Sequence, residues 1–214
     1  MRSAIKKYFS LTAAVLLVTG CASTPYDYSA FKAHHPRSIV VIPPNNNSVE
    51  VEAPYVYLST ITRPLAEKGY YVFPVAVVDR FFKENGLPTP AEMNAVPLDK
   101  IGEHIGADAV LYVSIEDWGQ KFQVVQSVGK VHAKLKLVDV DSGTLLWESV
   151  AFAQEASSDG GGGLIGKLVG AMVTQVMAST VSDSTPRLAR QANTAAINNK
   201  SNGMLDGPYK TTTP

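Results

Sequence analysis

The residue in this sequence best placed to do chemistry is its single cysteine. Cys21 follows Val18-Thr19-Gly20, and the four residues resemble a lipobox, the motif at which signal peptidase II cleaves before a lipid-modified cysteine. That reaction needs a thiol at one position, because the sulfur is the nucleophile that becomes the thioether. A lone cysteine forms no intramolecular disulfide, so an exported chain needs another reason to carry it. The motif therefore predicts acylation of Cys21.

The twenty residues before Cys21 have the three parts of a secretory signal: a basic start, the apolar run 9–18 and small residues before the cut. About ten apolar residues are too few to cross a hydrocarbon core of roughly 30 Å as a helix. We predict a signal peptide at residues 1–20 and attachment to membrane lipid through acylated Cys21. An aspartate after the cysteine favours retention in the inner membrane, so Ala22-Ser23 predict the outer membrane.

Removal of the signal peptide changes the charge of the chain. The sequence has 19 basic and 19 acidic residues, and residues 1–20 hold three of the basic ones and none of the acidic ones. The remaining 16 basic and 19 acidic residues give a net charge of about −3. No basic surface suited to nucleic acid is expected from this balance, so we predict no nucleic-acid partner.

A glycine-rich segment offers a second pattern. Residues 161–166 match the glycine spacing of the dinucleotide-binding fingerprint. No parallel strand follows, however, and no acidic residue lies at a strand end where it could bind a ribose, so we predict no cofactor. Gly162, Gly166 and Gly170 recur every four residues, and such a stripe lets two helix backbones approach closely. Three interpretations stay open: packing within the domain, a seam between copies, or insertion of residues 160–181 into a membrane.

Groupings typical of catalytic or metal sites are weak. The sequence has no Gly-x-Ser-x-Gly elbow and no His-Glu-x-x-His motif. The acid pairs Glu116-Asp117 and Asp139/Asp141 follow predicted strands, where carboxylates are usually solvated turn residues. His34-His35 lack further ligands at metal spacing. We predict no catalytic residue and no metal.

The remaining pattern predicts an α+β domain. Short apolar runs at 38–42 and 70–73 indicate strands, and helical spacing is found at 54–69, 75–84 and 98–105. Further strands are expected at 109–115, 122–127, 131–138 and 144–153, with a hairpin turn at Asp141-Ser142-Gly143. We expect a mixed sheet with helices packed on one face. Trp118 and Trp147 should pack on the sheet, or Trp118 should lie exposed at a hairpin tip.

The expected domain boundaries follow from composition. Residues 21–37 are polar and aperiodic, which predicts an acylated tether. A single domain is expected over 38–199, with a Gly-rich hinge at 158–163, an apolar helix at 164–181 and a polar helix at about 186–199. The turn-rich residues 200–214 are expected to form a loose tail.

Several segments together resemble a known family over nearly the whole chain. They are residues 41–46, 69–79, 85–87, 106–112, 137–139 with 143–147, 160–170 and 207–209. The sequence is similar to a family of bacterial outer-membrane lipoproteins that includes a meningococcal surface antigen and shares its fold with the amino-terminal domain of TolB. The resemblance implies a dimeric outer-membrane lipoprotein in an envelope transport or assembly system, alongside a lipoprotein similar to the curli-secretion pore protein. It brings no catalytic residues with it.

These observations favour a non-enzymatic lipoprotein of the cell envelope that acts as an accessory, binding or assembly module. One alternative is a pore or membrane-remodelling component that uses residues 160–181. Another is an envelope hydrolase that uses one of the acid pairs.

Overall fold

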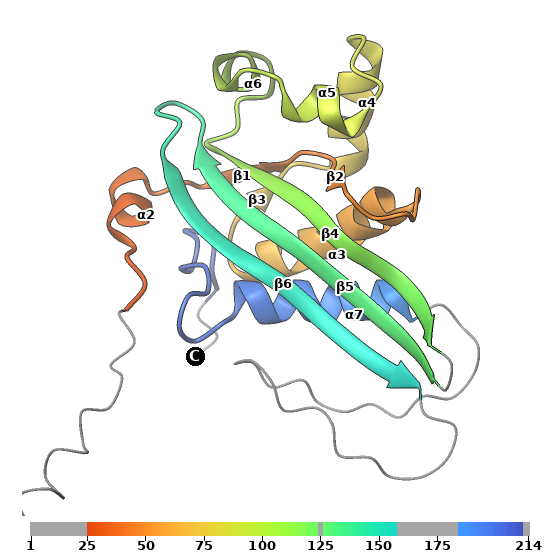
Figure 1. Ribbon diagram of the computed structural model, residues 1–214. Coiled ribbons are helices and arrows are strands. Elements are labelled where there is room, and N and C mark those ends of the chain that lie inside the picture. The colour runs from red at the N-terminus through yellow and green to blue at the C-terminus, as the bar shows by residue number, and fades with distance from the viewer. Residues whose placement is uncertain (1–24, 124–125, 158–183, 212–214) are drawn as a thin grey trace, which may run out of the picture.

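The protein folds around one mixed six-stranded sheet (Figure 1). The computed structural model describes residues 25–123, 126–157 and 184–211. The strands lie in the order β3-β1-β4-β5-β6, and the two-residue strand β2 pairs with β4 beyond β1. The expected α+β class and the mixed sheet are confirmed.

The first half of the chain builds the parallel part of the sheet. Strand β1 (Ser38–Val41) lies between β3 (Tyr71–Val72) and β4 (Ala109–Gln123) and runs parallel to both. Strand β2 (Asn45–Asn46) is also parallel to β4. Helix α3 (Ala53–Glu67) connects this region to β3. Residues 39–42 are fully buried because they face apolar clusters on both sides of the sheet, which explains their continuous hydrophobicity.

The second half is an antiparallel meander of three long strands. Strand β4 pairs with β5 (Gln126–Asp139), which pairs with β6 (Leu145–Ser157). The turn between β5 and β6 contains Gly143 at φ +70°, as its hairpin pattern predicted.

The sequence prediction ended a strand at Ile115, and this was wrong. Strand β4 continues to Gln123 through a register shift between Ile115 and Asp117. Trp118 stays on the helix-covered face, where it is buried with its ring centroid 6.3 Å from that of Tyr57. The expectation that Trp118 packs on the sheet is therefore confirmed, and the alternative of an exposed Trp118 at a hairpin tip was wrong. Burial of this large side chain favours continuation of the strand past its polar residues.

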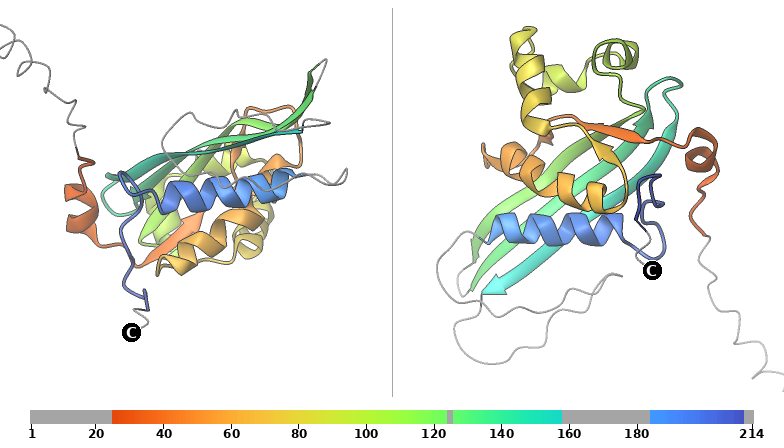
Figure 2. Two further views of the ribbon diagram at one scale, coloured as in Figure 1. Left: turned by 90° about the horizontal axis from the view of Figure 1, so that it is seen from below. Right: turned by 180° about the vertical axis from the view of Figure 1, so that it is seen from behind.

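Helices cover the two faces of the sheet unequally. The long helices α3 and α7 (Thr185–Ile197) lie side by side on one face, as Figure 2 shows. The helices α4 (Val75–Glu84), α5 (Pro90–Asn94) and α6 (Leu98–Ile105) form a second cluster with the opposite side of β1 and the start of β4. Beyond the layer expected on one face, the protein thus has a smaller second layer. It exists because Val40 and Ile42 present apolar side chains to that side.

The two long helices are joined by a buried polar network. The Tyr57 hydroxyl donates a hydrogen bond to Asn193 Oδ1, and Asn193 Nδ2 donates to Thr60 Oγ1 over 3.0 Å. All three residues are buried. Burial is also the cause of a pKa for Tyr57 well above the ordinary value, so this residue stays a neutral donor.

The expectation of a tether over residues 21–37 was wrong for its described part, residues 25–37. These residues include helix α2 (Ser29–His34), in which Phe31 is 4% exposed and packs against Tyr70. The Tyr28 hydroxyl donates a hydrogen bond to the carbonyl of Gly203. The aromatic residues of this segment bury enough surface to hold it on the domain.

The expected loose tail is likewise packed over its described part. Met204 is buried, and the N–H groups of Gly207 and Tyr209 donate to the carbonyls of Lys68 and Gly69 at 2.8 and 3.0 Å. A Cβ on Gly207 would lie 2.3 Å from the Gly69 oxygen, so this close approach requires glycine. Residues 200–211 therefore close the domain beside α2 and α3.

Candidate functional site

The site residues predicted from the sequence lie outside the described residues. These are Cys21 and the glycine stripe of Gly162, Gly166 and Gly170, together with the expected hinge 158–163 and apolar helix 164–181. The described chain stops at Ser157, the last residue of β6, and resumes at Ser184, just before α7. The described residues thus identify only where this glycine-rich segment joins the domain.

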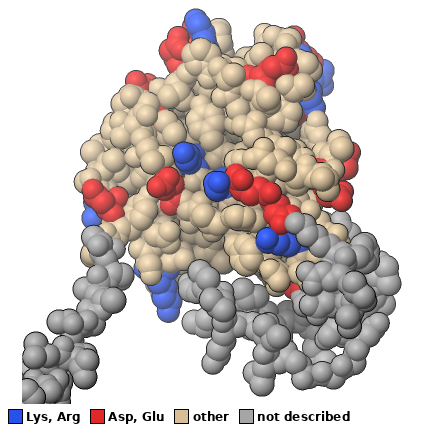
Figure 3. Space-filling model, viewed as in Figure 1, with Lys and Arg blue, Asp and Glu red and all other residues tan. Residues whose placement is uncertain are grey.

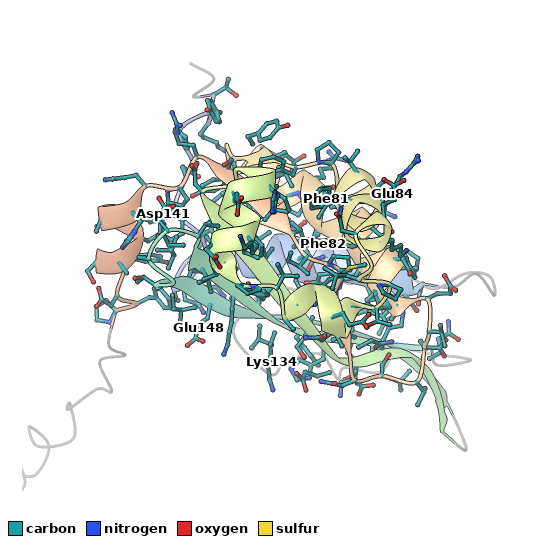
Figure 4. All side chains as sticks on the ribbon, turned by 90° about the horizontal axis from the view of Figure 1, so that it is seen from above. Phe81, Phe82, Glu84, Lys134, Asp141 and Glu148 are labelled. Atoms are coloured by element: carbon teal, nitrogen blue, oxygen red, sulfur yellow. The ribbon has the colours of Figure 1, made fainter. Side chains whose placement is uncertain are left out.

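A surface that sequence reasoning missed lies on the sheet opposite α3 and α7. On this side, helices α4–α6 cover one end of the sheet, and no other helix of the described chain covers β4, β5 and β6 (Figures 1 and 2). We call this surface the bare face. In Figure 4, Lys134 and Glu148 project from the sheet on this side, away from α7. The bare face comprises Tyr112, Ser114, Glu116, Asp117, Lys130, His132, Lys134, Lys136, Glu148, Val150, Phe152 and Gln154.

Strand alternation explains the composition of the bare face. Along β5, Val131, Ala133 and Leu135 are buried beneath the helices, and the polar residues between them face outward. The sequence already showed this alternation on β5. It did not show that β4 and β6 would extend the same surface on both sides, because that depends on strand pairing.

Two lysines of the bare face form ion pairs with carboxylates of β4. Lys134 Nζ lies 3.3 Å from Glu116 Oε1, and Lys130 Nζ lies 3.0 Å from Asp117 Oδ2. Figure 3 shows acidic and basic side chains interspersed over the middle of this face. A hydrogen bond from Ser114, assisted by Lys134, lowers the pKa of Glu116. Glu116 is therefore held as a carboxylate within an ion pair, which disfavours its use as a general acid.

Asp139, from the other acid pair, also has a structural role. Asp139 Oδ2 accepts hydrogen bonds from the N–H and hydroxyl of Ser142, at 2.9 and 2.7 Å, which shapes the β5–β6 turn. His34 Nδ1 lies 3.3 Å from the other oxygen of Asp139. Among the described residues, no three His, Cys, Asp or Glu side chains are grouped to hold a metal ion.

Apolar side chains are exposed at the β6 margin of the bare face. Val150 is 51% exposed and Phe152 is 44% exposed. The Phe152 ring meets His132 edge-on at a centroid distance of 5.9 Å, and Lys130 Nζ lies 5.8 Å from its centroid. Exposed aromatic and aliphatic groups within a charge-balanced rim are typical of protein-binding surfaces.

A recess with a mixed polar and apolar lining lies near the bare face. It has a volume of about 430 Å³ and is lined by amide, hydroxyl and small apolar groups, without an ionisable side chain. Asn47 Nδ2 donates to Ser114 Oγ at its rim over 3.2 Å. Its two hydroxyls, those of Thr89 and Ser114, donate hydrogen bonds to Glu92 Oε2 and Glu116 Oε1 at 2.7 and 2.9 Å. Its lining residues are Asn45, Asn46, Asn47, Thr89, Pro90, Ala91 and Ser114.

The structure and its relatives together define the class of protein. It is an α+β domain in which the described helices leave most of one sheet face uncovered, and no helix of the described ranges has the length and hydrophobicity to cross a bilayer. The family model described as "Putative lipoprotein GNA1162-like" matches residues 26–209. The chain belongs to this GNA1162-like lipoprotein family, which implies a membrane-anchored protein of the cell envelope.

Two relatives from Neisseria meningitidis agree with this assignment. The chain is 41% identical over 203 residues to the lipoprotein NMB1124/NMB1162 of Neisseria meningitidis serogroup B, covering 92% of this chain and 93% of the relative. It is similar to the crystal structure of lipoprotein GNA1162 from Neisseria meningitidis, with 42% identity and a TM-score of 0.55 over 60% of this chain and 90% of that chain. A PelC dodecamer structure from Paraburkholderia phytofirmans has 18% identity and a TM-score of 0.41, over 64% of this chain and 83% of that chain.

Proposed function

We propose that this lipoprotein is a non-enzymatic accessory module of an envelope transport or assembly system. In this proposal acylated Cys21 anchors it in the outer membrane, and it works as a homodimer that binds another envelope protein. A lipoprotein similar to the curli-secretion pore protein is the proposed partner, as the family resemblance implied.

The observation that carries this proposal is the bare face. It combines exposed Val150 and Phe152 with lysine–carboxylate pairs whose charges are already balanced. Such a surface can bury apolar area against a protein without burying an unpaired charge. Three of the four candidate acids have structural partners: Lys130 pairs with Asp117, Lys134 pairs with Glu116, and Asp139 accepts hydrogen bonds in the β5–β6 turn. This supports a binding role over catalysis.

A photo-crosslinking experiment in intact cells tests the binding role. Replacing Lys134 with benzoylphenylalanine places a photoreactive group in the middle of the bare face. The matched control carries it at Arg63, whose side chain is 80% exposed on α3. We expect the Lys134 variant alone to form a product that contains another envelope protein. The same products from both positions, or none from Lys134, would refute binding through the bare face.

Fatty-acid labelling tests the anchor separately. Cys21→Ala removes the only thiol of the chain, so we expect loss of the label and release of the protein from the membrane fraction. Folding should be unaffected, because the described domain begins packing only at residues 25–31. A label that persists on the variant would contradict the anchor. Fractionation of the wild-type protein with outer-membrane markers checks its location.

A pore or membrane-remodelling role for residues 160–181 is the alternative. It rests on the apolar, glycine-striped sequence alone, because this segment lies outside the described residues. Flotation with liposomes separates the two roles. Binding that requires residues 160–181 supports the alternative, and binding that requires only the lipid on Cys21 supports the accessory module.

A further inference from the structure

The two edges of the sheet are protected to different degrees. Strand β3 is only two residues long, and Pro74 follows shortly after it. Strand β6 is 13 residues long and pairs with β5 along its length. Short strands and prolines blunt an edge against pairing with another chain, and long regular strands without them do not. Residues 149–153 contain no proline, charge or bulge, so within the described chain β6 is the open edge.

A hydrogen bond to Tyr26 establishes which backbone groups of β6 face outward. The N–H of Glu148 donates to the Tyr26 hydroxyl over 2.9 Å, so it points away from β5. In an antiparallel strand, the N–H and C=O of every second residue point to the same side. Because no register shift interrupts β6 after residue 147, Val150 and Phe152 also present their backbone groups to the open edge.

The same two residues place their side chains at the margin of the bare face. Val150 and Phe152 therefore offer both free backbone hydrogen bonds and exposed apolar surface. Ala151 and Ala153, which face the helices, are small and leave room for a neighbouring strand. The nearest lysines on β5 already have carboxylate partners on β4, so a second copy would meet no uncompensated charge there.

We propose that β6 pairs with β6 of a second copy in antiparallel register, with the two-fold axis at Ala151. This inference rests on the homodimer proposed above and names its interface. The register places Val150 of each copy opposite Phe152 of the other, so that two apolar cross-strand pairs form on the bare face. The contact is isologous, with the same strand used by both copies.

Competing registers match the side chains less well. An axis at Val150 would place Glu148 opposite Phe152, and an axis at Phe152 would place Val150 opposite Gln154. With the axis at Ala151, Glu148 is opposite Gln154, and no like charges meet.

Tyr26 occupies the edge at Glu148 in each copy and so confines the pairing to the central residues. The axis is perpendicular to the sheet, so both bare faces point the same way and form one wider surface.

Cysteine crosslinking in intact membranes tests the interface. Two tagged full-length copies are co-expressed, one with Val150→Cys and one with Phe152→Cys. Opposed residues of an antiparallel pair have Cα atoms about 4.5–5.5 Å apart, within disulfide range. We expect mild oxidation to produce a mixed-tag dimer. The control replaces Phe152→Cys with Leu145→Cys, which has a similar exposure of 43% but lies seven residues farther along β6. It should give no such product, because about 20 Å separates the sulfurs.

Sedimentation of the detergent-extracted protein separates failure of the interface from failure of the dimer. The parent should sediment as a dimer, and Phe152→Lys should weaken association about tenfold or more, since both copies carry the added charge at the seam. Leu145→Lys should leave association unchanged. A dimer that neither crosslinks nor responds to Phe152→Lys would overturn this interface while leaving the proposed function intact. A parent that sediments as a monomer would overturn the homodimer as well.

Discussion

Substitution of Phe31 tests whether the segment after the anchor belongs to the domain. Phe31 is 4% exposed and belongs to the core cluster beneath α3 and α7. Truncating a buried phenylalanine to alanine typically costs about 3–5 kcal/mol of unfolding free energy. Helix α2 has only six residues, so it can undock locally before the whole domain unfolds, and this limits the loss. We therefore expect Phe31→Ala to cost about 3 kcal/mol, at the lower end of that range.

Thermal and denaturant unfolding of the chain without its lipid provide the assay. For a domain of this size, about 3 kcal/mol corresponds to a melting temperature lower by roughly 6–12 °C. The control is Lys32→Ala, an exposed position on the same helix, which should change stability by no more than about 0.5 kcal/mol. Equal stability of the two variants would refute the docking of α2 and restore the tether predicted from composition.

Two further predictions concern the helices. Tyr57→Phe leaves Asn193 Oδ1 without its buried donor and should lower the free energy of unfolding by about 1–3 kcal/mol. Denaturant unfolding measures this loss, with Tyr55→Phe, at an exposed position of the same helix, as the control. Equal stability of the two variants would show that the network does not stabilise the protein. Gly166→Leu tests the predicted glycine stripe. If β6 forms the dimer interface, sedimentation of this variant should still show a dimer. If the stripe packs inside the domain, the variant should lose about 1–3 kcal/mol of unfolding free energy. A shift of Gly166→Leu to monomer would instead assign the seam to the stripe.

The local elements of this protein were predictable because each depends on near neighbours in the chain. The continuous apolar run before Pro43-Pro44 predicted β1, and alternation predicted the buried and exposed residues of β5. Gly106 ends α6 in a left-handed conformation, as its position after an amphipathic run indicated. The lipobox-like motif at Cys21 is local in the same sense, and it remains a prediction.

The candidate site was less predictable, because its residues acquire their roles through strand pairing. Glu116 and Asp117 were expected to follow a strand as solvated turn residues. Burial of Trp118 continues β4 past them, and pairing with β5 places them beside Lys134 and Lys130. No pattern within a single strand could indicate this arrangement.

The sequence by itself determined most of the helices and strands and the apolar face of each, since these follow from periodicity over a few residues, and its lipobox-like motif predicts the export route. Only the tertiary structure decided which segments join the core and which strand is left at an edge. Tyr28 reaches Gly203 across 175 positions of sequence, and both segments had been predicted to lie outside the domain. Their polar composition hid this contact, because a few buried groups such as Phe31 and Met204 suffice to dock a short segment once a complementary surface exists.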